Sequence, residues 1–170
     1  RIAGVRGWTV DVVHPVVDAE HAAGAEVAHG IHELYEPLAE DKGLILTVEA
    51  SAAPLYGNRE LVSQALANLV ENAIAAAPRA GHVHVGIDVE VGHVTIAIDD
   101  DGPGVGGDPE PLFVPFKRGD ARSDGRMRAP GVGLGLAIAR RIVESHGGTL
   151  TASSSVLGGA RFSIKVPRRA

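Results

Sequence analysis

The chain has 170 residues, which is the size of one domain with one hydrophobic core. Hydrophobic residues make up 45% of the sequence and aromatic residues only 4%, so the core must be aliphatic and rich in alanine. The formal net charge of −5 argues against general nucleic-acid binding, which uses a basic face. The sequence has no cysteine, which excludes a disulfide framework and a thiolate metal site. No apolar run reaches the roughly 18 residues of a membrane span.

The first half of the chain is predicted to alternate strands and helices. Residues 10–17 are rich in β-branched residues and read as an edge strand. Apolar residues at helical spacing then predict a helix that ends near Lys42-Gly43. Residues 44–50 alternate as a half-buried strand does, residues 54–58 form a turn, and a second helix follows that is closed by Pro78. The residues expected to face the core from the two helices are Val27, Ile31, Leu34, Leu38, Leu61, Ala65, Leu66, Leu69 and Ala73.

The second half begins with a predicted hairpin that turns at Val91-Gly92. From Gly102 to Pro130 the sequence is rich in Gly, Pro, Asp and Arg and has little periodicity, which predicts a functional lid or disorder. A third helix is expected to start after Gly133 and to run to about His146. The strands predicted in this half cover residues 83–89, 94–99, 149–153 and 161–166. This order predicts an α+β fold, a two-layer α/β sandwich in which three helices cover one face of a mixed, mostly antiparallel sheet of about five strands.

Two asparagines on the second predicted helix form the first candidate site. Asn68 and Asn72 are four residues apart, so their amides lie on one face, and Glu71 lies on nearly the same face. Amide and carboxylate oxygens suit Mg²⁺, which usually bridges substrate phosphates. A solvated polar stripe on an amphipathic helix is the alternative interpretation.

An acidic turn at the end of an apolar strand forms the second candidate site. In Asp99-Asp100-Asp101-Gly102-Pro103-Gly104, a carboxylate can accept a hydrogen bond from an adenine amino group, and the glycines let the backbone approach the base. Guanine presents a carbonyl oxygen there, so the turn favours ATP over GTP; a solvated acidic turn is the alternative. Residues 102–107 also match G-x-G-x-x-G, but the prolines that follow exclude the helix of a dinucleotide fold.

A glycine run before the third helix forms the third candidate site. Gly131-Val132-Gly133-Leu134-Gly135-Leu136 leads directly into that helix. Free N–H groups at a helix N-terminus bind phosphate, and glycines remove the side chains that would obstruct it. A tight helix–helix packing contact is the alternative.

With these features in this order, the chain resembles the catalytic and ATP-binding domain of bacterial sensor histidine kinases, in the family shared with gyrase, Hsp90 and MutL ATPases. The resemblance runs from about Val10 to Pro167, and the order and spacing of its motifs are more specific than any one motif. The motifs are Asn68-Leu69-Val70-Glu71-Asn72-Ala73 (N box), Asp100-Asp101-Gly102-Pro103-Gly104 (first glycine box), Phe113-Val114-Pro115-Phe116-Lys117-Arg118-Gly119 (F box), Gly131 to Leu136 (second glycine box) and Gly158-Gly159-Ala160-Arg161-Phe162 (last turn).

The resemblance implies a role for each matching residue. Asp100 holds the adenine amino group, and Asn68 and Asn72 hold Mg²⁺ and the phosphates. Arg118, with the lid arginines Arg122, Arg126 and Arg128, is a candidate for γ-phosphate contact; a solvated basic loop is the alternative. The implied ATP-binding residues are Asn68, Asn72, Asp100, Gly102, Gly104, Val105, Phe116, Arg118, Gly131, Val132, Gly133, Leu134, Gly135 and Leu136, of which Asn68 and Arg118 are also catalytic.

Two departures from the motifs bear on activity. ATPases of this family typically carry a glutamate that activates water where this chain has Asn68, and an amide cannot act as a base, so the resemblance favours a kinase over a hydrolase. Ala75 and Ala76 stand where family members commonly carry a basic and an aromatic residue, which is expected to weaken ATP binding or transfer. An anti-sigma-type serine kinase, a gyrase-like ATPase and a non-catalytic nucleotide-binding regulatory module remain the alternatives.

The phosphoacceptor is expected to lie outside this chain. His32-Glu33-Leu34-Tyr35-Glu36-Pro37-Leu38 looks like an acceptor box, but no second hairpin helix fits between His32 and Asn68. We therefore expect residues 1–9 to be a linker from an upstream helical hairpin and 10–170 to be the ATP-binding domain, with a flexible lid at about 105–130. The chain begins at Arg1 without a methionine or signal pattern, so we expect it to be a piece of a longer protein. The resemblance implies that this piece is a cytoplasmic domain and that the parent protein is a dimer in the bacterial membrane. Its expected partners are that dimerisation domain and a response regulator.

Overall fold

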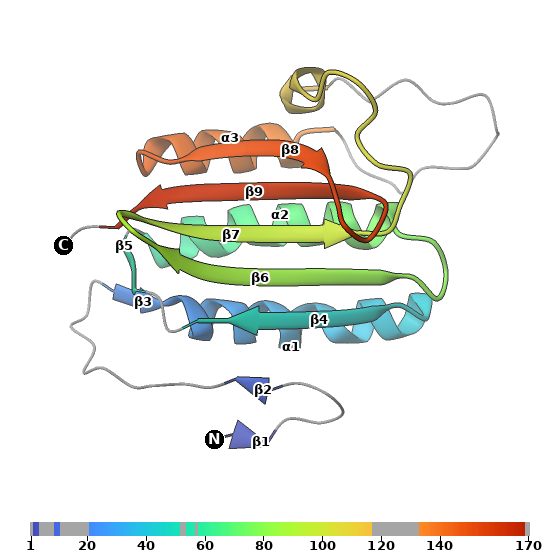
Figure 1. Cartoon of the computed structure of the whole chain (residues 1–170), viewed down its shortest axis with the longest axis horizontal. Coiled ribbons are helices and arrows are strands. Elements are labelled where there is room, and N and C mark those ends of the chain that lie inside the picture. The colour runs from blue at the N-terminus through green and yellow to red at the C-terminus, as the bar shows by residue number, and fades with distance from the viewer. Residues whose placement is uncertain are drawn as a thin grey trace.

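Three helices cover one face of a five-stranded sheet (Figure 1). The computed structural model describes residues 2–3, 9–10, 21–51, 54–56, 58–116 and 133–168, with the backbone alone at 2–3, 9–10, 21–23 and 54–56. The predicted α+β sandwich is confirmed by this arrangement. Among the described residues, no helix is both long enough and apolar enough to cross a bilayer.

The sheet has the strand order β4-β6-β7-β9-β8 and is mixed. β4 (Ile45–Ala50) pairs in parallel with β6 (His82–Glu90), whereas every other neighbouring pair is antiparallel. β6 and β7 (His93–Asp100) form the predicted hairpin, and its turn places Gly92 at a φ of 83°, in the left-handed region that favours glycine. β8 (Thr149–Ser154) and β9 (Ala160–Pro167) complete the sheet.

The helices α1 (Gly24–Lys42), α2 (Arg59–Ala76) and α3 (Gly135–Ser145) form the second layer, with α2 in the middle (Figure 1). The side chain of Asn58 caps α2 by accepting a hydrogen bond from the Leu61 N–H at 3.1 Å. The face of α2 that packs on the sheet is buried, so the helix is held in place and its polar residues have a fixed position. Its buried residues are Ala65, Leu66, Leu69, Val70, Ala73 and Ile74.

The predicted core face of α1 is partly wrong. Leu34 and Leu38 are 64% and 48% exposed, while Tyr35 and Ala39 are buried at their side. Val27 and Ile31 are buried as predicted, but the other buried side chains of this helix include three alanines and one tyrosine, and the two leucines lie at the edge of the buried side. On α2, Leu61 is 38% exposed because it lies in the first turn, at the edge of the packed region.

Three smaller differences concern short elements. The strand predicted over 10–17 is described only at its start, where β2 (Thr9–Val10) pairs with β1 (Ile2–Ala3); residues 11–17 lie outside the described part. Part of the predicted turn over 54–58 is instead a strand, β5 (Pro54–Tyr56), because it pairs with β3 (His21–Ala23). Between Gly102 and Pro130 a 3₁₀ turn, η1 (Glu110–Phe113), forms where no regular structure was expected.

Candidate functional site

The predicted site residues that the structure describes gather at one end of the molecule, where β7 ends, α2 ends and α3 begins (Figure 1). Gly135, the first residue of α3, lies against Asn68 of α2: a Cβ on Gly135 would stand 3.7 Å from Asn68 Cβ and 3.8 Å from its Oδ1. The N-terminus of α3 therefore faces the N box, as a phosphate site between the two helices requires.

Asn68 carries an unsatisfied polar group at this junction. Its Nδ2 is buried and has no hydrogen-bond partner within the described part of the chain. A buried donor without a partner costs about 1–3 kcal/mol, so such groups are rare outside ligand sites. Asn72 lies one turn further along α2 and is half-buried.

Glu71 turns away from the two asparagines. The Tyr35 hydroxyl of α1 donates a hydrogen bond of 2.6 Å to Glu71 Oε1. Burial raises the pKa of Tyr35, and the bond to Glu71 raises it further. Glu71 therefore links α1 to α2, and the ligand set on this face is reduced to Asn68 and Asn72.

Asp100 is another buried polar group that is incompletely satisfied. It is 0% exposed, and its Oδ1 accepts N–H bonds from Gly102 at 2.8 Å and Ala160 at 3.1 Å, whereas Oδ2 has no partner among the residues that the structure describes. Burial raises the pKa of Asp100, and the two backbone N–H groups counteract part of that rise. A Cβ on Gly102 would stand 2.7 Å from Ala76 O, so only glycine fits between Asp100 and the end of α2.

The neighbouring aspartates have structural partners, because successive side chains of a strand point to opposite faces. Asp99 accepts two bonds of 2.8 Å from Arg161. Asp101 Oδ2 accepts the N–H of His82 at 2.8 Å, and its Oδ1 packs so closely on Gly81 that a Cβ there would stand 2.5 Å away. Asp100 and Asp101 are each held at one oxygen and have no described partner at the other, but Asp101 Oδ1 lies against Gly81, whereas Asp100 lies beside the end of α2.

The described segments on either side of residues 117–132 meet at one point. The Phe116 N–H donates to Gly133 O at 3.1 Å, and both residues have positive φ, 62° and 73°. Arg140 of α3 fastens η1 nearby, because its guanidinium lies 4.7 Å from the Phe113 ring centroid and 2.8 Å from Glu110 Oε2. A positive φ in a bulky residue such as Phe116, which is 70% exposed, is a strained conformation.

The other predicted residues fall into two groups. Gly104, with a φ of 78°, and the half-buried Val105, Leu134 and Leu136 lie in the segments just described. Outside the described residues lie the remaining glycine-box residues and lid arginines, which are Arg118, Arg122, Arg126, Arg128, Gly131 and Val132.

Gly159 and Ala160, which contact Asp100, were not predicted as part of the site. A Cβ on Gly159 would overlap Asp100 Oδ1 and Gly102 N, and the next N–H, that of Ala160, binds Asp100. The sequence signal was the small-residue turn from Gly158 to Phe162, which resembles a family motif but carries no chemistry of its own.

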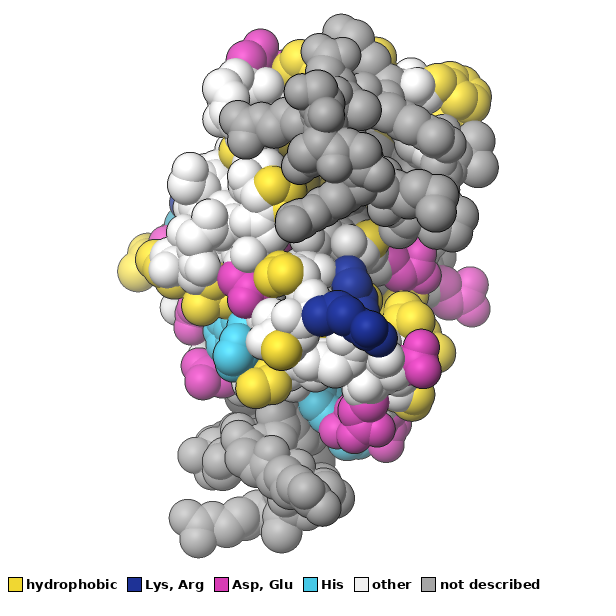
Figure 2. All heavy atoms as spheres, turned by 90° about the vertical axis from the view of Figure 1, so that its right-hand side faces the viewer, with side chains coloured by type: hydrophobic (Ala, Val, Ile, Leu, Met, Phe, Trp, Pro, Cys, Tyr) yellow, Lys and Arg dark blue, Asp and Glu magenta, His cyan; other side chains and the backbone are white. Residues whose placement is uncertain are grey.

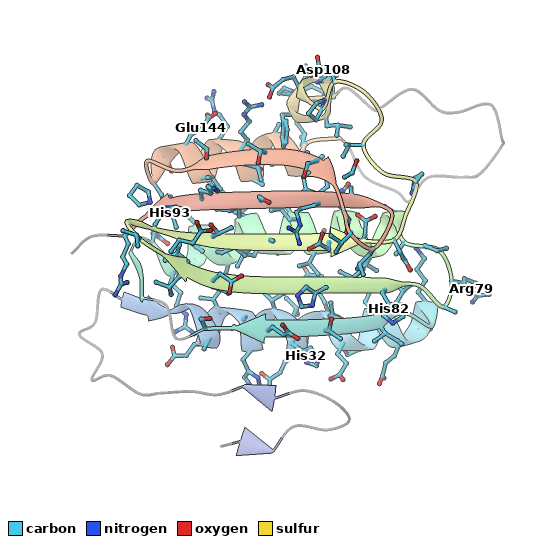
Figure 3. The ribbon with its side chains drawn as sticks, in the orientation of Figure 1. His32, Arg79, His82, His93, Asp108 and Glu144 are labelled. Carbon is cyan, nitrogen blue, oxygen red and sulfur yellow. The ribbon has the colours of Figure 1, made fainter. Side chains whose placement is uncertain are left out.

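Lys42 supplies a positive charge where the N box departs from its usual pattern. Its Nζ donates to the carbonyls of Ile74, Ala75 and Ala77 at 2.6, 3.0 and 2.7 Å. These bonds give the carbonyl groups at the C-terminus of α2 a partner, and the positive charge interacts favourably with the helix dipole. Figure 2 shows this end of the molecule, with Lys and Arg side chains in one compact group near its centre. Arg79 lies at the same end (Figure 3).

Comparison with known proteins agrees with this geometry. The family model described as histidine kinase-, DNA gyrase B-, and HSP90-like ATPase matches residues 57–170, more than half of the chain. The chain belongs to this family. Within it, the chain is an ATP-binding catalytic domain of the histidine kinase type.

Sensor histidine kinase CpxA of Escherichia coli (strain K12) is 42% identical over 134 residues, which cover 76% of this chain and 28% of that protein. Histidine-protein kinase/phosphatase MprB of Mycolicibacterium paratuberculosis is 35% identical over 127 residues, covering 72% of this chain and 24% of that protein. The chain thus spans about a quarter of the length of these relatives. The solved structure of the mycobacterial sensor histidine kinase MprB matches with a TM-score of 0.71 and 27% identity, over 88% of this chain and 97% of that one.

His32, the residue that imitates an acceptor histidine, lies on α1 (Figure 3) and is 9% exposed. Its Nδ1 lies 3.8 Å from Glu36 Oε2. A phosphoacceptor must reach the γ-phosphate of a bound nucleotide, and a side chain packed in this way is poorly suited to that role. The prediction that the acceptor lies elsewhere is supported by this burial.

Proposed function

We propose that this domain binds Mg·ATP and delivers the γ-phosphate to a histidine on a separate helical dimerisation domain. The observation that carries the proposal is Asp100 Oδ2 at the end of β7, a buried acceptor that has no partner in the described part of the chain. An adenine 6-amino group satisfies this oxygen, whereas the 6-carbonyl of guanine is repelled by it. The residues present therefore fit an adenine nucleotide.

The phosphates are bound at the junction of α2 and α3. Asn68 Nδ2 is a donor, so it suits a phosphate oxygen rather than a metal ion, and the α3 N-terminus beside Gly135 adds N–H groups and a positive dipole end. The amide oxygens of Asn72 and Asn68 are the protein ligands for Mg²⁺, which neutralises charge on the transferred phosphoryl group. Arg118 and the lid arginines Arg122, Arg126 and Arg128 are the candidates for contact with the γ-phosphate.

Transfer of the phosphoryl group depends on positioning the nucleotide and the nucleophile rather than on a catalytic base in this domain. Asn68 is an amide and takes no proton from water, so hydrolysis lacks a base at this point. The nucleophile is a histidine presented by the dimerisation domain, and a response-regulator aspartate receives the phosphate from it. Residues 1–9 are the linker to that domain, residues 105–130 are the lid, and the parent protein is a membrane-associated dimer.

A non-catalytic nucleotide-binding module is the second candidate. Ala75 and Ala76 are exposed at the end of α2 and present no side chain to a nucleotide beyond a methyl group. The test mixes the domain with labelled ATP and an upstream hairpin that carries a histidine. Nucleotide binding without transfer of the label to the hairpin favours this candidate. Sustained hydrolysis by the domain alone favours a gyrase-like ATPase, and phosphotransfer to a serine favours an anti-sigma-type kinase.

The direct test of the adenine site compares ATP binding by the wild-type chain and Asp100→Ala in calorimetry. We expect Asp100→Ala to weaken binding by at least tenfold, because a hydrogen bond to a charged group contributes about 1.5–3 kcal/mol. Asp88→Ala is the matched control, since Asp88 is an exposed aspartate of β6 on the same sheet. Equal affinity in the wild type and Asp100→Ala would remove the adenine assignment.

A further inference from the structure

Asp99 forms a buried network on the face of the sheet opposite the helices. It is 1% exposed, and Arg161 donates to both of its oxygens, from Nε to Oδ1 and from Nη2 to Oδ2, each at 2.8 Å. Ser155 Oγ donates to Oδ1 at 2.7 Å. Asp99 and Arg161 are cross-strand partners on β7 and β9, so the sheet register itself brings them together. Each oxygen of Asp99 is thus held by a donor.

Ser155 also organises the turn between β8 and β9. Its Oγ accepts the Leu157 N–H at 3.0 Å, its backbone N–H donates to Gly159 O at 2.9 Å, and its carbonyl accepts the Gly158 N–H at 3.1 Å. The side chain therefore sits inside the turn and ties it to Asp99 at the same time. Ser155 is 9% exposed, so water does not replace these bonds readily.

The same turn holds Asp100. The Gly159 N–H donates to the Asp100 carbonyl at 3.1 Å, and the Ala160 N–H donates to Asp100 Oδ1 at 3.1 Å. The second donor to Oδ1, Gly102 N–H, is local to Asp100 and independent of the turn. A continuous set of hydrogen bonds therefore runs from Asp99, through Ser155 and the turn, to the carboxylate of Asp100.

A carboxylate held by one donor can rotate about its Cβ–Cγ bond, whereas two donors on one oxygen fix where the other oxygen points. We propose that Ser155, anchored by Asp99 and Arg161, is a positioning residue that fixes the direction of Asp100 Oδ2 and so sets the selectivity of the site for a 6-aminopurine. This inference rests on the proposed adenine site. Ser155 itself does not touch the nucleotide, since it binds the opposite face of β7.

The test measures binding of ATP and of purine riboside triphosphate, which lacks the 6-amino group, by the wild-type chain and by Ser155→Ala. We expect the wild type to prefer ATP by at least tenfold and Ser155→Ala to lose about fivefold of that preference. The affinity for purine riboside triphosphate should stay within twofold. Ser153→Ala, at an exposed serine of β8, is the matched control and should keep the wild-type ratio.

Ser155→Thr retains the hydroxyl and should restore the ratio, and Asp99→Asn weakens the anchor without altering the turn, so it should lower the ratio in the same direction. An unchanged ratio in Ser155→Ala and Asp99→Asn, with thermal unfolding confirming folded protein, would overturn the inference. An equal loss of affinity for both nucleotides would also overturn it, because that result indicates a purely structural role. A wild-type chain that does not distinguish the two nucleotides would remove the adenine site, and with it this inference.

Discussion

At the end of β7, two neighbouring carboxylates on opposite faces of the sheet differ in how their oxygens are hydrogen-bonded. Asp99 on the open face and Asp100 on the helix face are 1% and 0% exposed. Both oxygens of Asp99 accept hydrogen bonds from side chains. Asp100 has backbone donors on one oxygen and, within the described ranges, no donor on the other. Equal burial therefore does not mean equal function: the carboxylate with an unsatisfied oxygen is the one available to a ligand.

The same contrast appears in the two pKa values. Burial on its own would raise the pKa of Asp99, but hydrogen bonds from Arg161 and Ser155 and the arginine charge hold it below its usual value. Burial raises the pKa of Asp100, and its backbone donors do not compensate fully. Asp99 thus stabilises the fold above the usual aspartate pKa, and this contribution is lost as pH falls through its lowered value. Asp100 has the opposite sign, because stability falls as pH rises between its usual and raised pKa values.

Asp100→Asn should have the largest effect on the helix face. Oδ1 must remain an acceptor for Gly102 and Ala160, so the new amide places its nitrogen where Oδ2 stood. This amide nitrogen repels the adenine amino group and donates a hydrogen bond to the 6-carbonyl oxygen of inosine. We expect ATP affinity to fall about 100-fold, or about 3 kcal/mol, and the order of ATP and ITP in competition binding to reverse. An unchanged order would mean that the base is read elsewhere.

Arg161→Ala should have the largest effect on the open face. It leaves Asp99 as a buried charge with Ser155 as its one remaining side-chain donor among the described residues, although the arginine side chain is 38% exposed and water offsets part of the loss. We expect unfolding free energy to fall by about 2 kcal/mol in urea titrations at neutral pH. Lys165→Ala, at an exposed position of the same strand, should change it by less than about 0.5 kcal/mol.

The pH dependence of that difference separates charge from packing. Without Arg161 the pKa of Asp99 is no longer held as low, so Asp99 of the variant takes up a proton at a higher pH than Asp99 of the wild type. The gap in unfolding free energy between wild type and Arg161→Ala should therefore shrink as pH falls from the variant's pKa to the lowered wild-type pKa of Asp99. A gap that stays constant with pH would assign the loss to the packing of the arginine stem instead.

The sequence predicts the helix face of this comparison better than the open face. α2 carries its apolar and polar residues in one period, so Leu66 and Leu69 on one side and Asn68 and Asn72 on the other follow from local spacing. Asp100 stands out because glycines follow an apolar strand. Each of these signals consists of residues that are close together in the sequence.

The open-face network has no local signal. Asp99 and Arg161 are 62 residues apart, and they meet only because the register of β7 and β9 makes them partners. In the sequence, nothing distinguishes Ser155 from other serines in turns, because its bond to Asp99 forms only in the folded chain. The prediction that Leu34 and Leu38 face the core is wrong for a related reason. Which edge of an apolar helix face is buried depends on how α1 packs on its neighbours, and local sequence does not show that.

Gly135→Ala should separate binding from stability on the helix face. The backbone of Gly135 is not in the left-handed region, and the added methyl would make an ordinary contact of 3.7 Å with Asn68 Cβ. We expect stability to be unchanged or to rise by up to about 1 kcal/mol, because alanine favours helix, while ATP affinity falls about tenfold as the methyl enters the phosphate path. Gly133→Ala, at a φ of 73°, should instead lose about 1–2 kcal/mol of stability. Undiminished ATP affinity in Gly135→Ala would contradict a phosphate at the start of α3.

Thr47→Val should have the smallest effect and marks the outer limit of the open-face network. Thr47 Oγ1 shares a hydrogen bond of 2.9 Å with His84 Nδ1, and His84 is the cross-strand partner of Asp99. Valine keeps the shape and favours strand, so we expect thermal and urea unfolding to show a loss of no more than about 0.5 kcal/mol. The ratio of ATP to purine riboside triphosphate should not change, because Ser155 and not His84 connects Asp99 to the turn. A changed ratio would extend the positioning network across β6 to β4 and would make the whole open face part of the nucleotide site.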